Sequence, residues 1–309
     1  MKNSIVYIIL ITVSTFCRSQ QESNFSYYMF NHQAINPAYT GSRGITNLTS
    51  VIRSQWVGLE GAPETQTITF GKSINSKNLG YGISILNDKI GPTNSTSFDI
   101  DLAYHLKLNE KGNRLSFGLK GGIHNYSLNS NLIQTLTPGD NAFVLDNDRK
   151  VLPNIGFGIY YFTQSFYSGF AIPRLLSDRE YNLEPHYYFI TGGLIRLSEV
   201  LILKPSFLLK QTKSIGGYDF SILGIINQNF WIGGQIRSSF NNYGLTNFQG
   251  TGMSALAGFQ ILENLSLGYS YGIPSNEISN GLSMPTHEIF LRLDVFSKGE
   301  AFLFSPRFF

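Results

Sequence analysis

Apolar and polar residues alternate one by one along many segments of this chain, and this pattern limits the possible folds more than any other feature. In residues 97–106, Phe98 and Ile100 are interleaved with Asp99 and Asp101. A period of two places the two kinds of side chain on opposite faces of a β-strand. On a helix, the same pattern would spread the apolar residues around the whole cylinder. The alternation therefore predicts strands with one apolar and one polar face.

The composition indicates what the apolar faces meet. Charged residues make up 14% of the chain, aromatic residues another 14%, and there are 31 glycines, whereas soluble domains carry roughly 25% charged residues. A mean hydropathy of −0.04 excludes a bundle of transmembrane helices, and Lys204 and Pro205 interrupt the best apolar run, residues 201–209. A membrane barrel with lipid outside and a polar lumen fits all these values. A large soluble β-protein is the alternative, and it leaves the low charge unexplained.

The alternating segments predict an all-β fold, a transmembrane antiparallel β-barrel of about fourteen strands. The even number agrees with bacterial single-chain barrels and predicts that both termini are periplasmic. The expected strands cover residues 43–56, 64–75, 79–87, 95–108, 113–126, 153–163, 165–172, 187–197, 200–211, 216–227, 229–240, 250–261, 263–273 and 285–297.

The lengths of the connections give an independent test of this topology. Short turns follow the even-numbered strands, while longer connections follow the odd-numbered ones, except at Thr212 to Ile215. Outer-membrane barrels have short periplasmic turns and longer outer loops, so the alternation in length predicts this kind of barrel. The longer connections are residues 57–63, 87–94, 127–152, 173–186, 241–249 and 274–284.

Both ends of the chain lie outside the predicted barrel, which covers residues 43–298. Residues 1–20 have the basic start and short apolar run of a secretory signal peptide. This segment contains the sole cysteine, Cys17, whose neighbour Phe16 fits a lipoprotein signal poorly. Residues 21–42 form an aromatic-rich segment expected in the periplasm or as a plug, and residues 299–309 form a periplasmic tail that ends in two phenylalanines.

No motif for catalysis, a cofactor or a metal is recognised, so the sequence predicts a protein that is not an enzyme and needs no cofactor. The five histidines have no spacing typical of metal ligands. Without the signal peptide the chain has 21 basic residues (23 minus Lys2 and Arg18) against 20 acidic ones, which argues against a nucleic-acid partner.

Several charged residues fall on the polar faces of the predicted strands and are expected to line the lumen. Closure of the barrel pairs the first strand with the last, which predicts an ion pair between Arg53 and Glu288. The bulky inward candidates Tyr160 and Phe290 favour a filled interior over an open pore. The expected lumen charges are Arg53, Asp99, Asp101, Lys120, Glu288, Arg292 and Asp294.

Several motifs resemble those of the PorP/SprF family, over nearly the whole mature chain. The opening signature consists of Tyr27-Tyr28-Met29-Phe30 and Asn36-Pro37-Ala38-Tyr39-Thr40-Gly41, followed by Arg53-Ser54-Gln55-Trp56 and Ala62-Pro63-Glu64-Thr65. Thr286-His287-Glu288-Ile289 and the terminal Ser305-Pro306-Arg307-Phe308-Phe309 are also similar to family patterns. As candidates for motif or partner contacts we select Asn36, Pro37, Tyr39, Gly41, Arg53, Gln55, Trp56, Pro63, His287 and Glu288.

The resemblance implies an outer-membrane component of the type IX secretion system of Bacteroidota, which in some members serves gliding motility. It implies periplasmic secretion components and secreted, adhesin-like cargo as partners, and it supplies no catalytic residues. We expect the long loop over residues 127–152 to dock cargo through Asp140, Asp146, Asp148 and Arg149, and the leader and tail to meet the periplasmic apparatus. Two other hypotheses remain: a passive porin or solute channel, which would conduct ions, and a purely structural barrel or surface adhesin, whose deletion would leave export intact.

Overall fold

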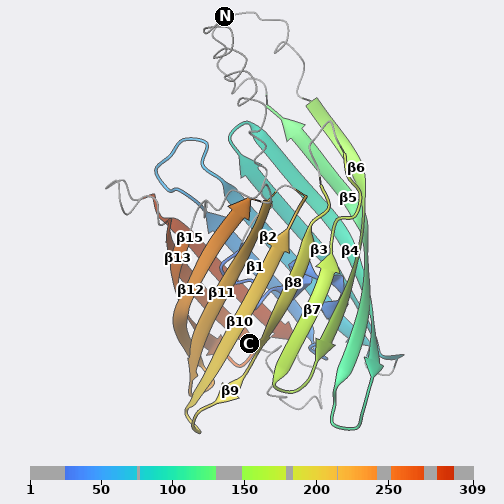
Figure 1. The fold of residues 1–309 in the computed structure, drawn as a ribbon, viewed down its shortest axis with the longest axis vertical. Coiled ribbons are helices and arrows are strands. Elements are labelled where there is room, and N and C mark those ends of the chain that lie inside the picture. Colours follow the sequence, from blue (N-terminus) through green and yellow to red (C-terminus); the bar gives the residue numbers. More distant parts are fainter. Residues whose placement is uncertain are drawn as a thin grey trace, which may run out of the picture.

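The computed structural model describes residues 25–74, 77–129, 148–178, 184–213, 215–241, 252–274 and 284–295. Within these ranges most of the chain lies in antiparallel strands that are tilted relative to the long axis of the molecule (Figure 1). The strands are β1 (Thr46–Ser54), β2 (Glu64–Ile74), β3 (Leu79–Ile90), β4 (Thr93–Lys107), β5 (Arg114–Leu128), β6 (Asp148–Phe162), β7 (Phe166–Ile172), β8 (Tyr187–Gly193), β9 (Ile195–Arg196), β10 (Leu201–Gln211), β11 (Ile215–Ile226), β12 (Phe230–Asn241), β13 (Gly252–Leu262), β14 (Leu265–Pro274) and β15 (Thr286–Val295).

The sheet closes on itself. Strand β1 pairs with β15 from Thr46 opposite Val295 to Ser54 opposite His287, so the first and last strands of the described chain are neighbours. Because β8 and the two-residue β9 both pair with β10, the wall of the described chain is a closed barrel of fourteen strands plus one short extra strand. The predicted all-β barrel of about fourteen strands is confirmed.

The break between β8 and β9 has a local cause in β10. Pro205 lies in the middle of β10, and its carbonyl oxygen faces Gly192 of β8. Proline has no N–H to donate to a neighbouring strand, and the pairing of β8 with β10 accordingly stops at Ser206 opposite Gly192. It resumes in the same register at Leu203 opposite Ile195. The single strand predicted over residues 187–197 is therefore divided.

The two faces of the wall differ as the alternation predicts. On β4, Leu102 is 56% exposed on the outside, whereas the neighbouring Asp101 is fully buried on the inside. The same contrast recurs on β15, where Ile289 faces outward and Glu288 inward. The outer surface of the described strands is therefore rich in apolar side chains, as a wall that faces lipid requires, while polar side chains gather in the lumen.

Two of the predicted long connections are shorter than expected. Strand β3 continues to Ile90, and β4 begins already at Thr93. The predicted loop over residues 87–94 is therefore a two-residue turn, Gly91-Pro92. Strands β5 and β6 are also longer, and pair up to Leu128 opposite Asp148. Residues 127–129 and 148–152 of the predicted 127–152 loop thus belong to the wall or its edge.

Residues 25–45, which we call the lumen segment, lie inside this barrel. The segment contains one turn of α-helix, α2 (His32–Ile35), and a 3-10 turn, η2 (Pro37–Tyr39). Nearly all of its residues are buried against the wall, Tyr27 and Ala38 completely. Among the helices in the described ranges, none is long and apolar enough to cross a membrane.

Candidate functional site

The predicted ion pair between Arg53 and Glu288 is confirmed. The two residues face each other across the β1–β15 seam, and Arg53 Nη1 lies 3.2 Å from Glu288 Oε2, with both side chains buried. A buried ion pair requires further hydrogen bonds to offset the loss of hydration. The lumen segment supplies these bonds.

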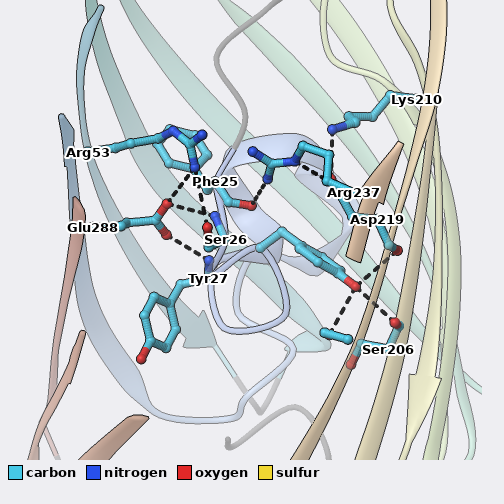
Figure 2. A network of polar contacts seen from close by, with 11 residues as sticks. Phe25, Ser26, Tyr27, Arg53, Ser206, Lys210, Asp219, Arg237 and Glu288 are labelled. Atoms are coloured by element: carbon cyan, nitrogen blue, oxygen red, sulfur yellow. Dashed lines mark hydrogen bonds and ion pairs between the residues drawn. The ribbon is translucent and has the colours of Figure 1, made fainter. Parts of the chain in front are cut away.

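Glu288 binds the main chain of the lumen segment (Figure 2). Its two carboxylate oxygens accept hydrogen bonds from the backbone N–H groups of Ser26 and Tyr27, each at 2.7 Å. Arg53 donates a longer bond to Ser26 Oγ, at 3.3 Å. Hydrogen bonds to an ionised carboxylate are stronger than those between neutral groups, so this pair is the firmest attachment of the first described residues.

A second charged group faces it from the other wall (Figure 2). Asp219 of β11 accepts hydrogen bonds from Lys210 Nζ of β10 at 2.7 Å and from Arg237 Nε of β12 at 2.6 Å. Arg237 also donates through Nη2 to the carbonyl oxygen of Phe25, at 3.0 Å. Three adjacent strands thus hold one further main-chain atom of the lumen segment.

Two consecutive tyrosines of the segment extend toward different parts of the wall. The hydroxyl of Tyr27 lies 2.7 Å from the carbonyl oxygen of Ala257 and 2.9 Å from that of Tyr269. The hydroxyl of Tyr28 donates to the carbonyl oxygen of Ser206 at 2.9 Å. Both buried hydroxyls are therefore satisfied by backbone groups of the barrel.

The middle of the lumen segment is held in the same way. Lys204 Nζ donates to the carbonyl oxygen of Met29 at 3.0 Å and lies 4.2 Å from the centre of the Phe30 ring. In the other direction, Gln33 Nε2 donates to the carbonyl oxygen of Phe70 at 2.8 Å, and Asn36 Nδ2 to that of Ile159 at 3.1 Å. Hydrogen bonds thus join the lumen segment to the wall along the length of the segment.

An apolar core lies beside these bonds. Tyr27 stacks on Phe290 with ring centres 5.1 Å apart, and Phe30 packs on Trp231 at 5.4 Å. Tyr160 is fully buried and meets Tyr39 edge to face at 5.4 Å. The expectation that Tyr160 and Phe290 fill the interior is confirmed.

Glycines occupy the positions of the wall where its backbone comes closest to the lumen segment. A Cβ atom added at Gly118 would overlap the backbone of Pro37 and Ala38, and one added at Gly158 would overlap the Asn36 side chain. Gly41, with φ +74°, has a backbone conformation that disfavours L side chains, and a Cβ there would lie 2.6 Å from Gly80 Cα. The segment and the wall therefore fit each other at the level of the backbone.

The far end of the lumen segment has its own ion pair. Arg43 donates two parallel hydrogen bonds to Asp294, from Nη1 to Oδ1 at 2.6 Å and from Nη2 to Oδ2 at 2.7 Å. Bidentate arginine–carboxylate pairs combine strength with a fixed geometry. Arg292 Nε lies 3.6 Å from the same carboxylate.

The predicted lumen charges on β4 and β5 also lie together. Lys120 Nζ is 2.9 Å from Asp101 Oδ1 and 3.8 Å from Asp99 Oδ2. Asp99 accepts a further hydrogen bond from Asn154 at 2.8 Å, and Asp101 lies 3.3 Å from Gln33 Nε2 of the lumen segment. These charges satisfy one another within a filled interior.

The selected family-motif residues divide into two groups. Asn36, Pro37, Tyr39 and Gly41 lie in the lumen segment and share the interior with Arg53 and Glu288. The remaining residues lie away from it. The Gln55 N–H donates to the Pro63 carbonyl at 2.9 Å, which closes the base of the β1–β2 connection, while Trp56 is exposed there. The His287 side chain faces outward and lies 2.6 Å from the Tyr269 hydroxyl.

The four residues expected to dock cargo belong to neither of these two groups. Arg149 is exposed on β6, opposite Ser127, and Asp148 precedes it in the same strand, so the prediction that both belong to a loop was wrong. The alternation ends before them because a strand that leaves the bilayer has no lipid-facing side to keep apolar. Asp140 and Asp146 lie outside the described residues.

Several residues that hold the lumen segment were not selected from the sequence. Lys204, Asp219 and Arg237 lie on inward-facing positions of predicted strands, and the same alternation that selected Asp99 could have identified them. The roles of Tyr27 and Tyr28 had no such signal, because their partners are backbone carbonyls more than 170 positions away in the chain. Among the described residues, no group of three or more His, Cys, Asp or Glu side chains could hold a metal ion.

Comparisons with known proteins address the chain as a whole. The family model described as type IX secretion system membrane protein PorP/SprF matches residues 17–293. Similar solved structures include the toluene transporter TbuX of Ralstonia pickettii, with 10% identity and a TM-score of 0.50 over 88% of this chain and 94% of that one. The outer membrane protein Omp33 of Acinetobacter baumannii has 6% identity and a TM-score of 0.44 over 81% and 98%. At these identities the likeness concerns the fold alone. No curated protein matches the chain.

Proposed function

Because the chain belongs to the family of type IX secretion system membrane proteins PorP/SprF, we propose that it supports the secretion or surface attachment of cargo such as adhesins by docking it, without catalysis. The chain is an integral β-barrel of the outer membrane. Its family is one of membrane proteins of a secretion system and not a family of enzymes.

The observation that carries the proposal is the filled lumen. The lumen segment is bound to the wall by charged and neutral hydrogen bonds from Phe25 to Arg43. A folded cargo domain cannot share that space, because the wall and the segment touch at backbone distance near Gly118. The ends of the barrel are then the surfaces left for cargo and for other secretion components.

We assign cargo docking to the end that carries the β1–β2 connection and the connection between β5 and β6. Asp140, Asp146, Asp148 and Arg149 are the candidates there, and Arg149 is an exposed cation at the edge of the wall. We assign the periplasmic components to the other end, where the tail at residues 299–309 follows β15. Residues 25–42 of the leader are less suited to that contact, since they are buried in the lumen.

A deletion of residues 130–147, bridged by the short linker Gly-Ser-Gly, tests the docking proposal. It leaves Leu128 and Asp148, the last pair of the β5–β6 ladder, in place, so the barrel should still fold and insert. We expect reduced export or surface attachment of the cargo, measured by comparing secreted and surface proteins with those of a strain that lacks the gene. Exchanging Glu110 and Lys111, in the exposed turn at the opposite end, for serine is the matched control. Unchanged export after the deletion would argue against docking at this loop.

A passive solute channel is the second candidate, and the polar lining of the wall favours it. Thr65, Thr67 and Thr69 all face inward on β2, and buried charged side chains occur on β1, β4, β5, β10, β11 and β15. A channel needs water along the whole lumen. The lumen segment would therefore have to move out of the barrel. Conductance separates the two functions.

A further inference from the structure

The lumen segment has a definite direction relative to the barrel. The N–H groups of Ser26 and Tyr27 are bound by Glu288, the third residue of β15. Glu288 lies opposite Arg53, the next-to-last residue of β1. The first described residues are therefore held near the end of the barrel at which β1 finishes and the β1–β2 connection begins.

The last residues of the lumen segment are held at the other end. Arg43 is bound by Asp294, the next-to-last residue of β15, and β1 then begins at Thr46 opposite Val295. Glu288 and Asp294 are six positions apart on β15, a distance of about 20 Å along an extended strand. Between Ser26 and Arg43 the chain thus crosses most of the lumen, antiparallel to β1.

The opposite wall gives the same direction independently. Arg237, which binds the Phe25 carbonyl, also binds Asp219 near the start of β11. Asp219 is joined to Lys210, the next-to-last residue of β10. Strands β10 and β1 run in the same direction around the closed antiparallel ring, so the end of β10 and the end of β1 lie at the same end of the barrel.

From these contacts we propose that the amino-terminal end of the mature chain emerges at the end of the barrel that carries the β1–β2 connection. The carboxyl end of β15 lies at the opposite end, beside the start of β1. The two ends of the mature chain then leave the barrel on different sides of the membrane, in contrast to the sequence-based expectation that both are periplasmic.

This topology has a consequence for interactions that is independent of cargo docking. A partner that binds the amino-terminal residues meets them on the face of the long connections. A partner in the compartment where β1 begins meets the region after β15.

Single cysteines test the proposal, because Cys17 is the sole cysteine of the chain and Cys17→Ser removes it. Ser23→Cys probes the residues just before the lumen segment. Glu60→Cys, exposed in the β1–β2 connection, and Lys111→Cys, exposed in the β4–β5 turn at the other end, are the references. Each variant is labelled with a membrane-impermeant maleimide on intact cells and again after the outer membrane is opened, and heat-dependent gel mobility confirms that the barrel is folded.

We expect Ser23→Cys to be labelled under the same condition as Glu60→Cys and under a different condition from Lys111→Cys. Labelling together with Lys111→Cys would overturn the proposal, as would a cysteine that reacts only after the barrel is unfolded. Glu22→Cys provides a second position if Ser23→Cys does not fold.

Discussion

At the scale of single residues, three charged side chains of the wall bind main-chain atoms of the lumen segment. Glu288 binds two backbone N–H groups, while Arg237 and Lys204 each bind a backbone carbonyl. Such contacts fix the backbone of the lumen segment and do not depend on which side chains it carries. They also leave Arg53 dependent on Glu288, because the arginine is buried and the carboxylate is its nearest anionic partner.

Glu288→Gln should therefore destabilise the folded barrel by about 3 kcal/mol, the usual cost when one member of a buried ion pair is removed. Denaturant unfolding in detergent micelles measures this, with the fluorescence of the buried Trp231 as the signal in a background where the exposed Trp56 is replaced by phenylalanine. Glu110→Gln, which alters only the solvent-exposed pair with Lys107, is the control and should leave the midpoint unchanged. Equal midpoints for the two variants would show that Glu288 does not hold the segment.

At the scale of elements, the sequence predicted the strands of the wall well, and it did so for a physical reason. Lipid on one side and a polar lumen on the other impose strict alternation wherever a strand crosses the bilayer. Beyond the bilayer both faces meet water, and there the ends of β3, β5 and β6 were missed. The sequence left the place of the lumen segment open between the periplasm and a plug, because its contacts join residues such as Tyr27 and Glu288, which are 261 positions apart.

The fit between the lumen segment and β5 gives a prediction at this scale. Gly118→Ala places a methyl group against the backbone of Pro37 and Ala38, whereas Gly121→Ala, three residues further along the same strand, meets nothing within 4 Å. Overpacking of this kind costs about 2 kcal/mol. We expect a lower unfolding midpoint and altered Trp231 fluorescence for the first variant, and values close to those of the unmodified protein for the second. If both behave alike, the segment does not rest on this part of the wall.

At the scale of the whole molecule, the barrel and the lumen segment form one closed object. The ring of strands is complete without the segment, since β1 pairs directly with β15, and the segment then fills the space that the ring encloses. We propose that a secretion-system barrel built in this way acts through its two ends. For a member of a type IX secretion family, this requires that the lumen segment stays in place when the barrel is in the membrane.

Ion conductance of the purified, full-length mature protein in planar lipid bilayers tests this claim most directly. Because the lumen segment is bound from Phe25 to Arg43, we expect the protein to insert without stepwise increases in current over a range of applied voltages. Steady, ohmic current steps of the size given by open porins, from protein that is folded by its gel mobility, would contradict it.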